Sequence, residues 1–536
     1  MVSDSDNYGA PPNDVVMAQQ GIVCSAHPYA TSVGINVMRR GGNAVDAAIA
    51  AAAVLTMVEP RNGHLGGDTF VQISLPDAQG VVAINGSGRA PENATLNRFD
   101  QTKTIPKDGL LSAAVPGTVD CWGQVAARYG TMTLAELLEP AAAYAQEGVP
   151  VTKRLHQMIA LDADKYSRSP ESAKTFLPNG EVPRVGTIWQ QSELAKSLRL
   201  IGADGEKAFY DGELTEKMVA YSSSHGGLFT HHDFASHKTE TLEPLSTTYR
   251  GYVVFEQPPV SQGLIVLIAL NILQEFDLQA TGQGSADTLH LLVEATKLAF
   301  EARIGHLGDP AFVDVPIEQL LSSEYAKEQA ARIDPKRAAA RPVPVSKHRD
   351  TTYLCTADQS GLMVSYIHSL FSGSGVVMGE TGVLMNSRML GFELDPRHPN
   401  CLAPGKRPVH TLNTYVVYQD DHPIIVGGTP GAHWQVQTNL QILTNVLDFD
   451  MDPQSAIDAP RFTLGDQLTL GGQTLKLESR VGSKVIEQLV GLGHHVDITG
   501  PWESGGSVQL IARDTNTGIY SGATEVRRPG SSVIGY

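Results

Sequence analysis

The stretch that decides the fold is DTTYLCTA at residues 350–357, which is rich in β-branched and aromatic side chains and predicts a β-strand. A turn sequence, DQSG, follows at 358–361, and a second strand-like run, LMVSYIH, follows at 362–368. The preceding residues 335–349 contain three prolines and no apolar periodicity, which predicts an exposed, flexible segment. Thr351 would therefore be the first residue of a β-hairpin that is held by sheet hydrogen bonds, while the chain before it would lie outside the sheet.

Cleavage of the bond between Asp350 and Thr351 would turn Thr351 into a complete nucleophile. Its hydroxyl would lie beside its own α-amine, whose pKa of roughly 7.7–8.0 suits a general base near neutral pH. The hydroxyl would first attack the Asp350 carbonyl to give an ester that water opens, and would then attack an amide substrate. An Asp-Thr pair also occurs at ordinary loop-to-strand junctions, so the pair indicates this chemistry only in context.

The context is a series of glycine- and proline-rich motifs in a fixed order along the chain. They are GGNAVDAA at 41–48, GHLGGDTF at 63–70, AVPGT at 114–118, YRGY at 249–252, LGDP at 307–310, PGKRP at 404–408, GTPG at 428–431 and DAPRF at 458–462. Together with Asp350-Thr351 they resemble the γ-glutamyltransferase family, the glutathione hydrolases and their acylase-like relatives among the N-terminal nucleophile hydrolases. The resemblance covers nearly the whole chain and implies a four-layer αββα sandwich, an arrangement that composition alone does not indicate.

The resemblance also implies a precursor that is cut in two. The large piece would be residues 1–350, which end in the flexible segment 335–350, and the small piece would be residues 351–536, which begin with the nucleophile Thr351. The two pieces would stay together as the subunits of one enzyme. A dimer of this two-subunit enzyme is an alternative that the sequence leaves open.

The same resemblance gives roles to residues around the nucleophile. Backbone N–H groups of Gly431 and Ala432 would stabilise the oxyanion, helped by the positive end of the helix expected after them; an ordinary glycine turn at a helix start is the alternative. Ser369 aligns roughly with a family threonine that supports the nucleophile, and its alternative is a plain strand serine. His410 and Thr411 stand where the family has a serine pair near the substrate, but their side chains differ in kind.

Specificity is where the sequence departs most from the resemblance. The family's arginine for the substrate α-carboxylate lies a few residues before an Ala-Pro pair, whereas Arg89 directly precedes Ala90. Gly391 stands where the family has an acidic acceptor for the α-amino group, and a family asparagine is replaced near Phe371. Guanidinium groups remain at Arg89 and at Arg388, unless Arg388 is a surface cation. Such a site is expected to favour an acyl group that carries a carboxylate and no free amine.

Composition argues against several other classes of protein. The chain of 536 residues has 40 Lys and Arg against 57 Asp and Glu, and this net charge of −17 argues against nucleic acid or an anionic membrane as a partner. The longest apolar run, 47–58, is too short for a membrane span, which takes roughly twenty residues. No signal peptide is visible and the four cysteines form no CxxC pair, so we expect a cytoplasmic protein with reduced thiols.

No cofactor and no metal are expected. The chain has no GxSxG elbow, no GxxxxGK(S/T) loop and no HExxH pair. The adjacent pairs His231-His232 and His494-His495 are expected to be exposed loop histidines, because neighbouring side chains diverge in helices and in strands.

The apolar periodicity outlines the order of the elements. It predicts two helices within 28–58 that are broken at Gly41-Gly42, paired strands near 71–75 and 81–84, mostly helices from 120 to 330, strands from 351 to 430, and a helix over 432–448.

The sequence therefore predicts a self-processing threonine amidohydrolase that acts on a small-molecule amide. Three substrate classes compete: γ-glutamyl amides such as glutathione, glutaryl amides of β-lactams, and small oxo-acid amides. A scaffold that kept the fold without activity is a further alternative, which the intact Asp350-Thr351 pair and the GTPG turn oppose.

Overall fold

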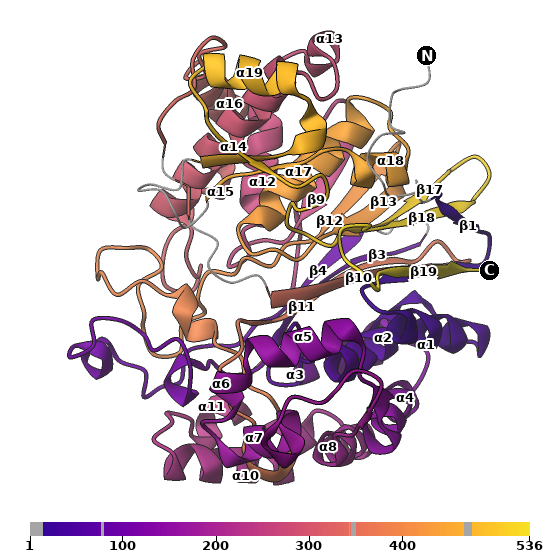
Figure 1. Cartoon of the computed structure of the whole chain (residues 1–536), viewed down its shortest axis with the longest axis vertical. Coiled ribbons are helices and arrows are strands. Elements are labelled where there is room, and N and C mark those ends of the chain that lie inside the picture. Colours follow the sequence, from indigo (N-terminus) through magenta and orange to yellow (C-terminus); the bar gives the residue numbers. More distant parts are fainter. Residues whose placement is uncertain (1–13, 77–79, 342, 345–349, 466–473) are drawn as a thin grey trace.

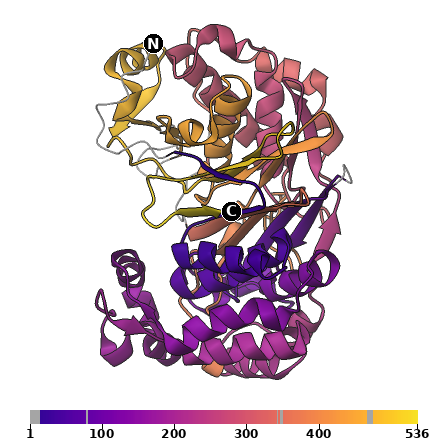
Figure 2. The same ribbon diagram turned by 90° about the vertical axis from the view of Figure 1, so that its right-hand side faces the viewer.

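The computed structural model describes residues 14–76, 80–341, 343–344, 350–465 and 474–536. Two seven-stranded sheets are stacked on each other, and helices cover the outer side of each sheet (Figure 1). The view at 90° shows the same order of layers (Figure 2). This arrangement is the four-layer αββα sandwich that the family resemblance implies, and that prediction is confirmed.

Every pair of neighbouring strands in the two large sheets is antiparallel. The first sheet contains, in spatial order, β1 (Val16–Ala18), β18 (Tyr520–Thr524), β17 (Gln509–Arg513), β13 (His422–Gly428), β12 (Tyr415–Gln419), β9 (Tyr252–Glu256) and β8 (Leu245–Tyr249). The second sheet contains β19 (Ser532–Gly535), β2 (Gly21–Ser25), β10 (Asp350–Asp358), β11 (Met363–Phe371), β3 (Asp68–Ser74), β4 (Val81–Gly86) and β7 (Glu240–Leu242).

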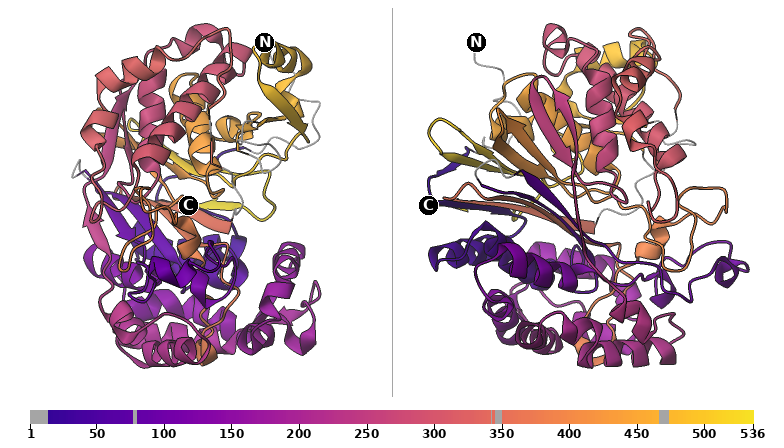
Figure 3. Two further views of the ribbon diagram at one scale, coloured as in Figure 1. Left: turned by 90° about the vertical axis from the view of Figure 1, so that its left-hand side faces the viewer. Right: turned by 180° about the vertical axis from the view of Figure 1, so that it is seen from behind.

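Helices from different parts of the chain form the two outer layers (Figure 3). On the side of the second sheet lie α1 (Pro28–Arg39), α2 (Ala44–Val58), α3 (Thr118–Tyr129), α4 (Leu134–Glu147), α5 (Lys153–Leu161), α6 (Ala163–Tyr166), α7 (Pro170–Phe176), α8 (Ser192–Asp204), α9 (Lys207–Tyr210), α10 (Glu213–Ser224) and α11 (His231–Ala235). On the side of the first sheet lie α12 (Gly263–Leu273), α13 (Leu278–Thr281), α14 (Ala286–His306), α15 (Ile317–Leu320), α16 (Ser323–Ala330), α17 (Trp434–Leu447), α18 (Pro453–Asp458) and α19 (Ser483–Gly491).

Two smaller sheets lie outside the sandwich. One contains β14 (Phe462–Thr463), β15 (Thr474–Glu478) and β16 (His495–Thr499), and the other contains β5 (Val149–Pro150) and β6 (Ile188–Trp189).

The break between α1 and α2 follows from local chemistry, as predicted. Gly41 adopts a φ of 99°, which ends α1 in a conformation that a side chain would strain. Asn43 then caps α2 in a capping box, in which its side chain accepts from the Asp46 backbone N–H and the Asp46 carboxylate accepts from the Asn43 N–H. Every residue of α2 is buried, and the helix contacts both β10 and β11.

The predicted hairpin is present as β10 and β11, with Thr352 opposite His368 and Ala357 opposite Met363. The predicted pair of strands on either side of Pro76 is present as β3 and β4. The core between the two large sheets includes Tyr353 and Ile367 of the hairpin and Val426 of β13, which are all buried.

The expectation of strands from 351 to 430 is wrong for residues 372–414. That part forms turns, two short 3₁₀ helices (Gly379–Thr381 and Arg388–Gly391) and isolated bridges. Glycines with positive φ recur through it, for example Gly373 and Gly405, and they interrupt any long strand.

In the described part of the segment 335–350, residues 335–337 and 340 are exposed, as expected, while other residues of the segment contact the body. Arg341 Nη1 lies 2.7 Å from Glu294 Oε2 on α14, and the Ala338 N–H donates to the Leu492 carbonyl at 2.7 Å. Val343 is buried against the same side of the molecule. Residues 342 and 345–349 lie outside the described residues, so the expectation stays a prediction there.

Across the ranges that the structure describes, no helix is both long and apolar enough to cross a membrane.

Candidate active site

Thr351 lies at the start of β10, where it is buried and in contact with β11. Its Oγ1 donates a hydrogen bond to Ser369 Oγ at 3.0 Å, and Ser369 Oγ also accepts from the Phe371 N–H at 2.8 Å. β2 pairs with β10 only from Cys355 to Asp358, so the first residues of β10 extend past the end of that neighbour. The structure thus brings Thr351 and Ser369 together at one end of a central hairpin.

The turn after β13 approaches the same strand. A Cβ on Gly428 would lie 2.5 Å from the ring of Tyr353, so only glycine allows this close approach of β13 to β10. Gly431 and Ala432 both have positive φ, 135° and 53°. An alanine with φ near 53° is unusual and strained, and such residues often lie at functional sites.

Gln262 holds this turn in place. Its Nε2 donates to the Ala432 carbonyl at 3.1 Å and to the Thr411 carbonyl at 2.7 Å. α17 begins directly after the turn at Trp434, so the backbone N–H groups at its N-terminus add partial positive charge. The sequence analysis did not single out Gln262, because nothing in the local pattern shows that it reaches two segments more than 140 residues away.

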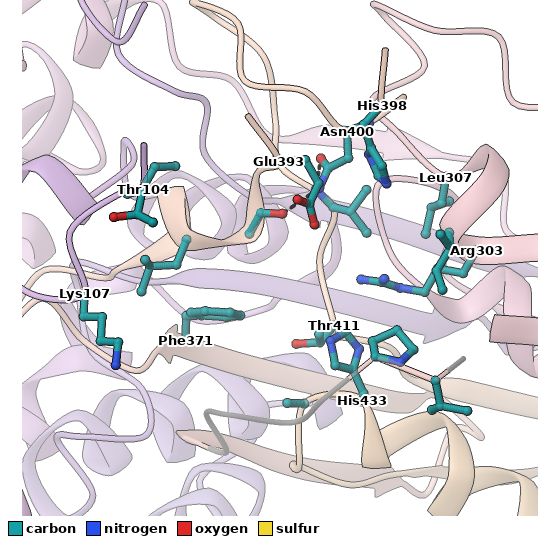
Figure 4. A pocket seen from close by; sticks show the side chains of 18 of the residues that line it. Thr104, Lys107, Arg303, Leu307, Phe371, Glu393, His398, Asn400, Thr411 and His433 are labelled. Carbon is teal, nitrogen blue, oxygen red and sulfur yellow. Dashed lines mark hydrogen bonds between the residues drawn. The ribbon is translucent and has the colours of Figure 1, made fainter. Parts of the chain in front are cut away.

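A cavity of about 790 Å³ lies beside these elements (Figure 4). It is lined by Thr104, Ile105, Pro106, Lys107, Arg303, Ile304, Leu307, Val343, Pro344, Phe371, Leu390, Gly391, Glu393, His398, Asn400, Val409, Thr411, Ala432 and His433. Phe371 and Ala432 connect it to the nucleophile, since Phe371 shares Ser369 with Thr351 and Ala432 belongs to the turn after β13.

The predicted site residues divide between the cavity wall and the interior behind it. Thr411 and Ala432 line the cavity, and so does Gly391. His410 is buried, and burial, together with Arg388 and Arg407, lowers its pKa well below the usual value and keeps its ring neutral.

Arg89 and Arg388 are not among the residues that line the cavity. Arg89 Nη2 lies 3.2 Å from Glu240 Oε1, in a half-buried ion pair. Arg388 is fully buried rather than a surface cation, with its Nε 3.0 Å from Asp68 Oδ2 and its guanidinium 4.8 Å from the centre of the Phe371 ring. Burial raises the pKa of Asp68, an effect that Arg388 opposes.

Five charged or titratable residues of the described cavity lining were missed from the sequence, namely Lys107, Arg303, Glu393, His398 and His433. Arg303 lies in the last turn of α14, Glu393 follows the 3₁₀ helix Arg388–Gly391, and His433 follows Ala432. Burial lowers the pKa of Arg303 to about 10, while Glu393 opposes that shift. Burial and the charge of Arg303 lower the pKa of His433 well below its usual value. The only local signal for Arg303 was its position four residues before the LGDP motif.

Outside this cavity, one cluster of side chains has the residue types of a metal site, but its carboxylate is already paired with cations. His290, Glu294 and His494 lie together in the interior, which corrects the expectation that His494 is an exposed loop residue. His290 Nδ1 lies 2.8 Å from His494 Nε2, and the Glu294 carboxylate is paired at 2.7 Å with both Lys297 and Arg341. The carboxylate is thus committed to two cations, and we propose no metal there.

Comparisons with known proteins show the family to which the chain belongs. A family model described as gamma-glutamyltranspeptidase matches residues 30–535. The "Glutathione hydrolase-like YwrD proenzyme" of Bacillus subtilis is 38% identical, over 97% of this chain and 99% of that protein. The "Acylase ACY 1 proenzyme" of Pseudomonas sp. strain SE83 is 35% identical, over 96% of this chain and 93% of that protein.

A solved structure has the same fold as this chain. The crystal structure of cephalosporin acylase from Bacillus halodurans superposes with a TM-score of 0.92 at 36% identity, and covers 100% of this chain and 99% of that one. The family match over nearly the whole chain and the shared fold lead to one conclusion: the chain belongs to the gamma-glutamyltranspeptidase family and is an enzyme of that type.

Proposed function

We propose that this chain is a self-processing N-terminal threonine amidohydrolase. The observation that carries the proposal is the hydrogen bond between Thr351 Oγ1 and Ser369 Oγ, made at a strand start beside the turn that holds Gly431 and Ala432. In the uncut chain this bond orients the hydroxyl that must attack the Asp350 carbonyl. The printed names of two relatives also support processing, because both are proenzymes.

Processing and catalysis would use the same hydroxyl. Attack of Thr351 Oγ1 on the Asp350 carbonyl moves the acyl group from nitrogen to oxygen, and water then hydrolyses the ester to leave the Asp350 carboxylate and a free Thr351 amine. In turnover the amine takes the hydroxyl proton, Oγ1 attacks the substrate carbonyl, and the proton passes to the leaving amine. Water, or an acceptor amine, then releases the acyl group from Thr351.

The turn after β13 is suited to stabilise the charge that develops in both steps. We assign the backbone N–H groups of Gly431 and Ala432 to the oxyanion, since preorganised donors of this kind typically contribute a large part of the rate enhancement. Ser369 would position Thr351, and Gln262 would position Ala432.

The cavity supports an acyl group that carries a carboxylate. Its volume of about 790 Å³ is in the range of sites for drug-sized ligands and exceeds what a small oxo-acid needs. Glu393 offers an acceptor for an ammonium group, which favours γ-glutamyl amides. Glutaryl amides, including those of β-lactams, are the alternative, because Gly391 supplies no acid at the position where the family resemblance expects one.

The decisive test is the state of the purified chain on a denaturing gel. We expect two pieces of 350 and 186 residues (536 minus 350), the smaller of which begins Thr-Thr-Tyr-Leu-Cys. Thr351→Ala should remain uncut and should hydrolyse neither γ-glutamyl nor glutaryl anilide. Thr352→Ser is the matched control, because it changes the neighbouring threonine and should still be cut before Thr351. A chain that is fully active while uncut would refute the proposal.

A further inference from the structure

The described lining of the cavity contains two strongly basic groups, of which Lys107 is exposed and Arg303 is half-buried. Figure 4 shows the Arg303 guanidinium pointing away from α14 into the cavity, toward the side where Phe371 and Thr411 lie. Its Nε is buried and has no hydrogen-bond partner among the described residues. No carboxylate in the described part of the chain lies within 4.0 Å of it.

Arg303 is half-buried, and the arginines of this molecule that are more deeply buried are paired. Arg388 has Asp68 at 3.0 Å, Arg407 has Glu240 at 2.7 Å, and Arg461 has Glu525 at 2.7 Å. A cation that is partly removed from water and has no close counter-ion is costly, and proteins seldom keep one unless a ligand or function uses it. Arg303 is therefore the exception that needs a reason.

The guanidinium keeps its charge under ordinary conditions. Burial lowers the pKa of Arg303, partly opposed by Glu393, but only to about 10, so the group is protonated near neutral pH. His433, its neighbour across the cavity, is neutral, because burial and Arg303 itself lower the pKa of that ring. The inner part of the cavity thus presents one positive charge with a planar set of donors, which matches a carboxylate.

The same cavity includes the elements that we place around the reacting carbonyl. Ala432 and Phe371 lie in its wall, and the Phe371 N–H shares Ser369 with the Thr351 hydroxyl. Apolar side chains such as Ile304 and Leu390 line the space as well. An acyl chain whose carbonyl is at Thr351 can therefore run through an apolar stretch with its far end at Arg303.

We propose that Arg303 binds the distal carboxylate of the acyl group and so selects substrates in which the acyl chain ends in an acid. This inference rests on the proposed function. It assigns the carboxylate to Arg303 and not to Arg89 or Arg388, whose guanidinium groups are already paired with Glu240 and Asp68.

The test compares two anilides that differ only at the far end of the acyl chain. Glutaryl anilide carries the distal carboxylate and pentanoyl anilide lacks it. In Arg303→Met, kcat/KM for glutaryl anilide should fall roughly 10- to 100-fold, the range for hydrogen bonds to a charged group, whereas the value for pentanoyl anilide should change little. Arg303→Lys should keep part of the preference, because it keeps the charge without the planar donors. Arg199→Met, which removes an exposed arginine of α8 that pairs with Glu139, is the control and should leave both values unchanged.

Two further measurements distinguish a failure of this inference from a failure of folding or of the proposed function. A thermal melting curve shows whether each variant has folded, and Arg303→Gln replaces Arg303→Met if the latter fails to fold. Calorimetric binding of glutarate tests Arg303 without catalysis, so that it decides the inference even if no anilide is hydrolysed and the proposed function fails. Weaker glutarate binding in the variant supports the inference, whereas equal binding refutes it. An unchanged ratio of the two anilides in Arg303→Met, or a ratio that collapses only in Arg89→Met, would also refute it.

Discussion

Replacing Ser369 by alanine should slow both self-cleavage and turnover without removing the nucleophile. Ser369 Oγ accepts hydrogen bonds from Thr351 Oγ1 at 3.0 Å and from the Phe371 N–H at 2.8 Å. Alanine removes the acceptor of both. The Thr351 hydroxyl then loses the bond that orients it, and the Phe371 amide loses its link to the same oxygen, so the start of β10 is held less firmly against the end of β11.

The magnitude follows from these two bonds. A typical buried hydrogen bond contributes about 1 kcal/mol, and a buried group that loses its partner costs about 1–3 kcal/mol. If this cost falls on the transition state, each 1.4 kcal/mol is tenfold in rate, so a loss of 1–3 kcal/mol slows the reaction roughly 5- to 150-fold. Ser369→Thr keeps a hydroxyl at the position and should restore most of the rate.

The assay is a time course of precursor cleavage on a denaturing gel, with anilide hydrolysis measured on the cut protein. Ser74→Ala is the matched control. It removes a buried serine hydroxyl that lies 2.8 Å from Tyr418 Oη at the far end of β3, roughly 20 Å along the strand from the residue that pairs with Ser369. It should lower the melting temperature without changing the cleavage rate. If Ser369→Ala cleaves as fast as the unaltered chain, Ser369 is an ordinary strand serine and the positioning role is wrong.

Two pH dependences complete the predictions. An N-terminal Thr351 amine must be unprotonated to act as a base, so hydrolysis should rise with pH on a limb at or below roughly 7.7–8.0, and a chelator should have no effect; inhibition that added zinc reverses would contradict this. Burial alone would raise the pKa of Glu59, but Arg528 at 2.6 Å and Arg154 at 2.9 Å lower it from 4.5 to about 2. A lowered carboxyl pKa stabilises the fold above pH 4.5 and the stabilisation is lost as the pH falls toward 2, by roughly 3 kcal/mol. Thermal melting should therefore be less sensitive to acid in Glu59→Gln than in the unaltered chain, and an identical acid dependence would show that this ion cluster is not responsible.

The sequence predicted those parts of the fold whose cause is local. The capping box of Asn43 and Asp46, the break at Gly41 and the β-branched run after Thr351 are all short-range patterns, and the helices and strands that they predict are present. The four-layer arrangement came from the family resemblance, because the order of strands in a sheet depends on contacts between segments hundreds of residues apart.

The site was predicted where a motif marks it and missed where only the fold assembles it. Ser369 was placed from its alignment, and it does meet Thr351. Arg303 was missed because most of its environment is made by residues that are distant from it in sequence, for example those at 104–107, 390–400 and 432–433. The same reason explains His494, whose partner His290 lies on a helix 204 residues earlier.

Both large sheets contain strands from before Thr351 and from after it, and a cut at that residue would change the order of the folding reaction. An intact chain refolds at a rate that does not depend on its concentration, whereas two severed pieces must first collide, and neither could complete a sheet alone. The covalent link between the two pieces would then allow the precursor to fold as one chain, and cleavage would remove that link after folding. The mature molecule would then stay folded because it unfolds slowly, and not because it can refold.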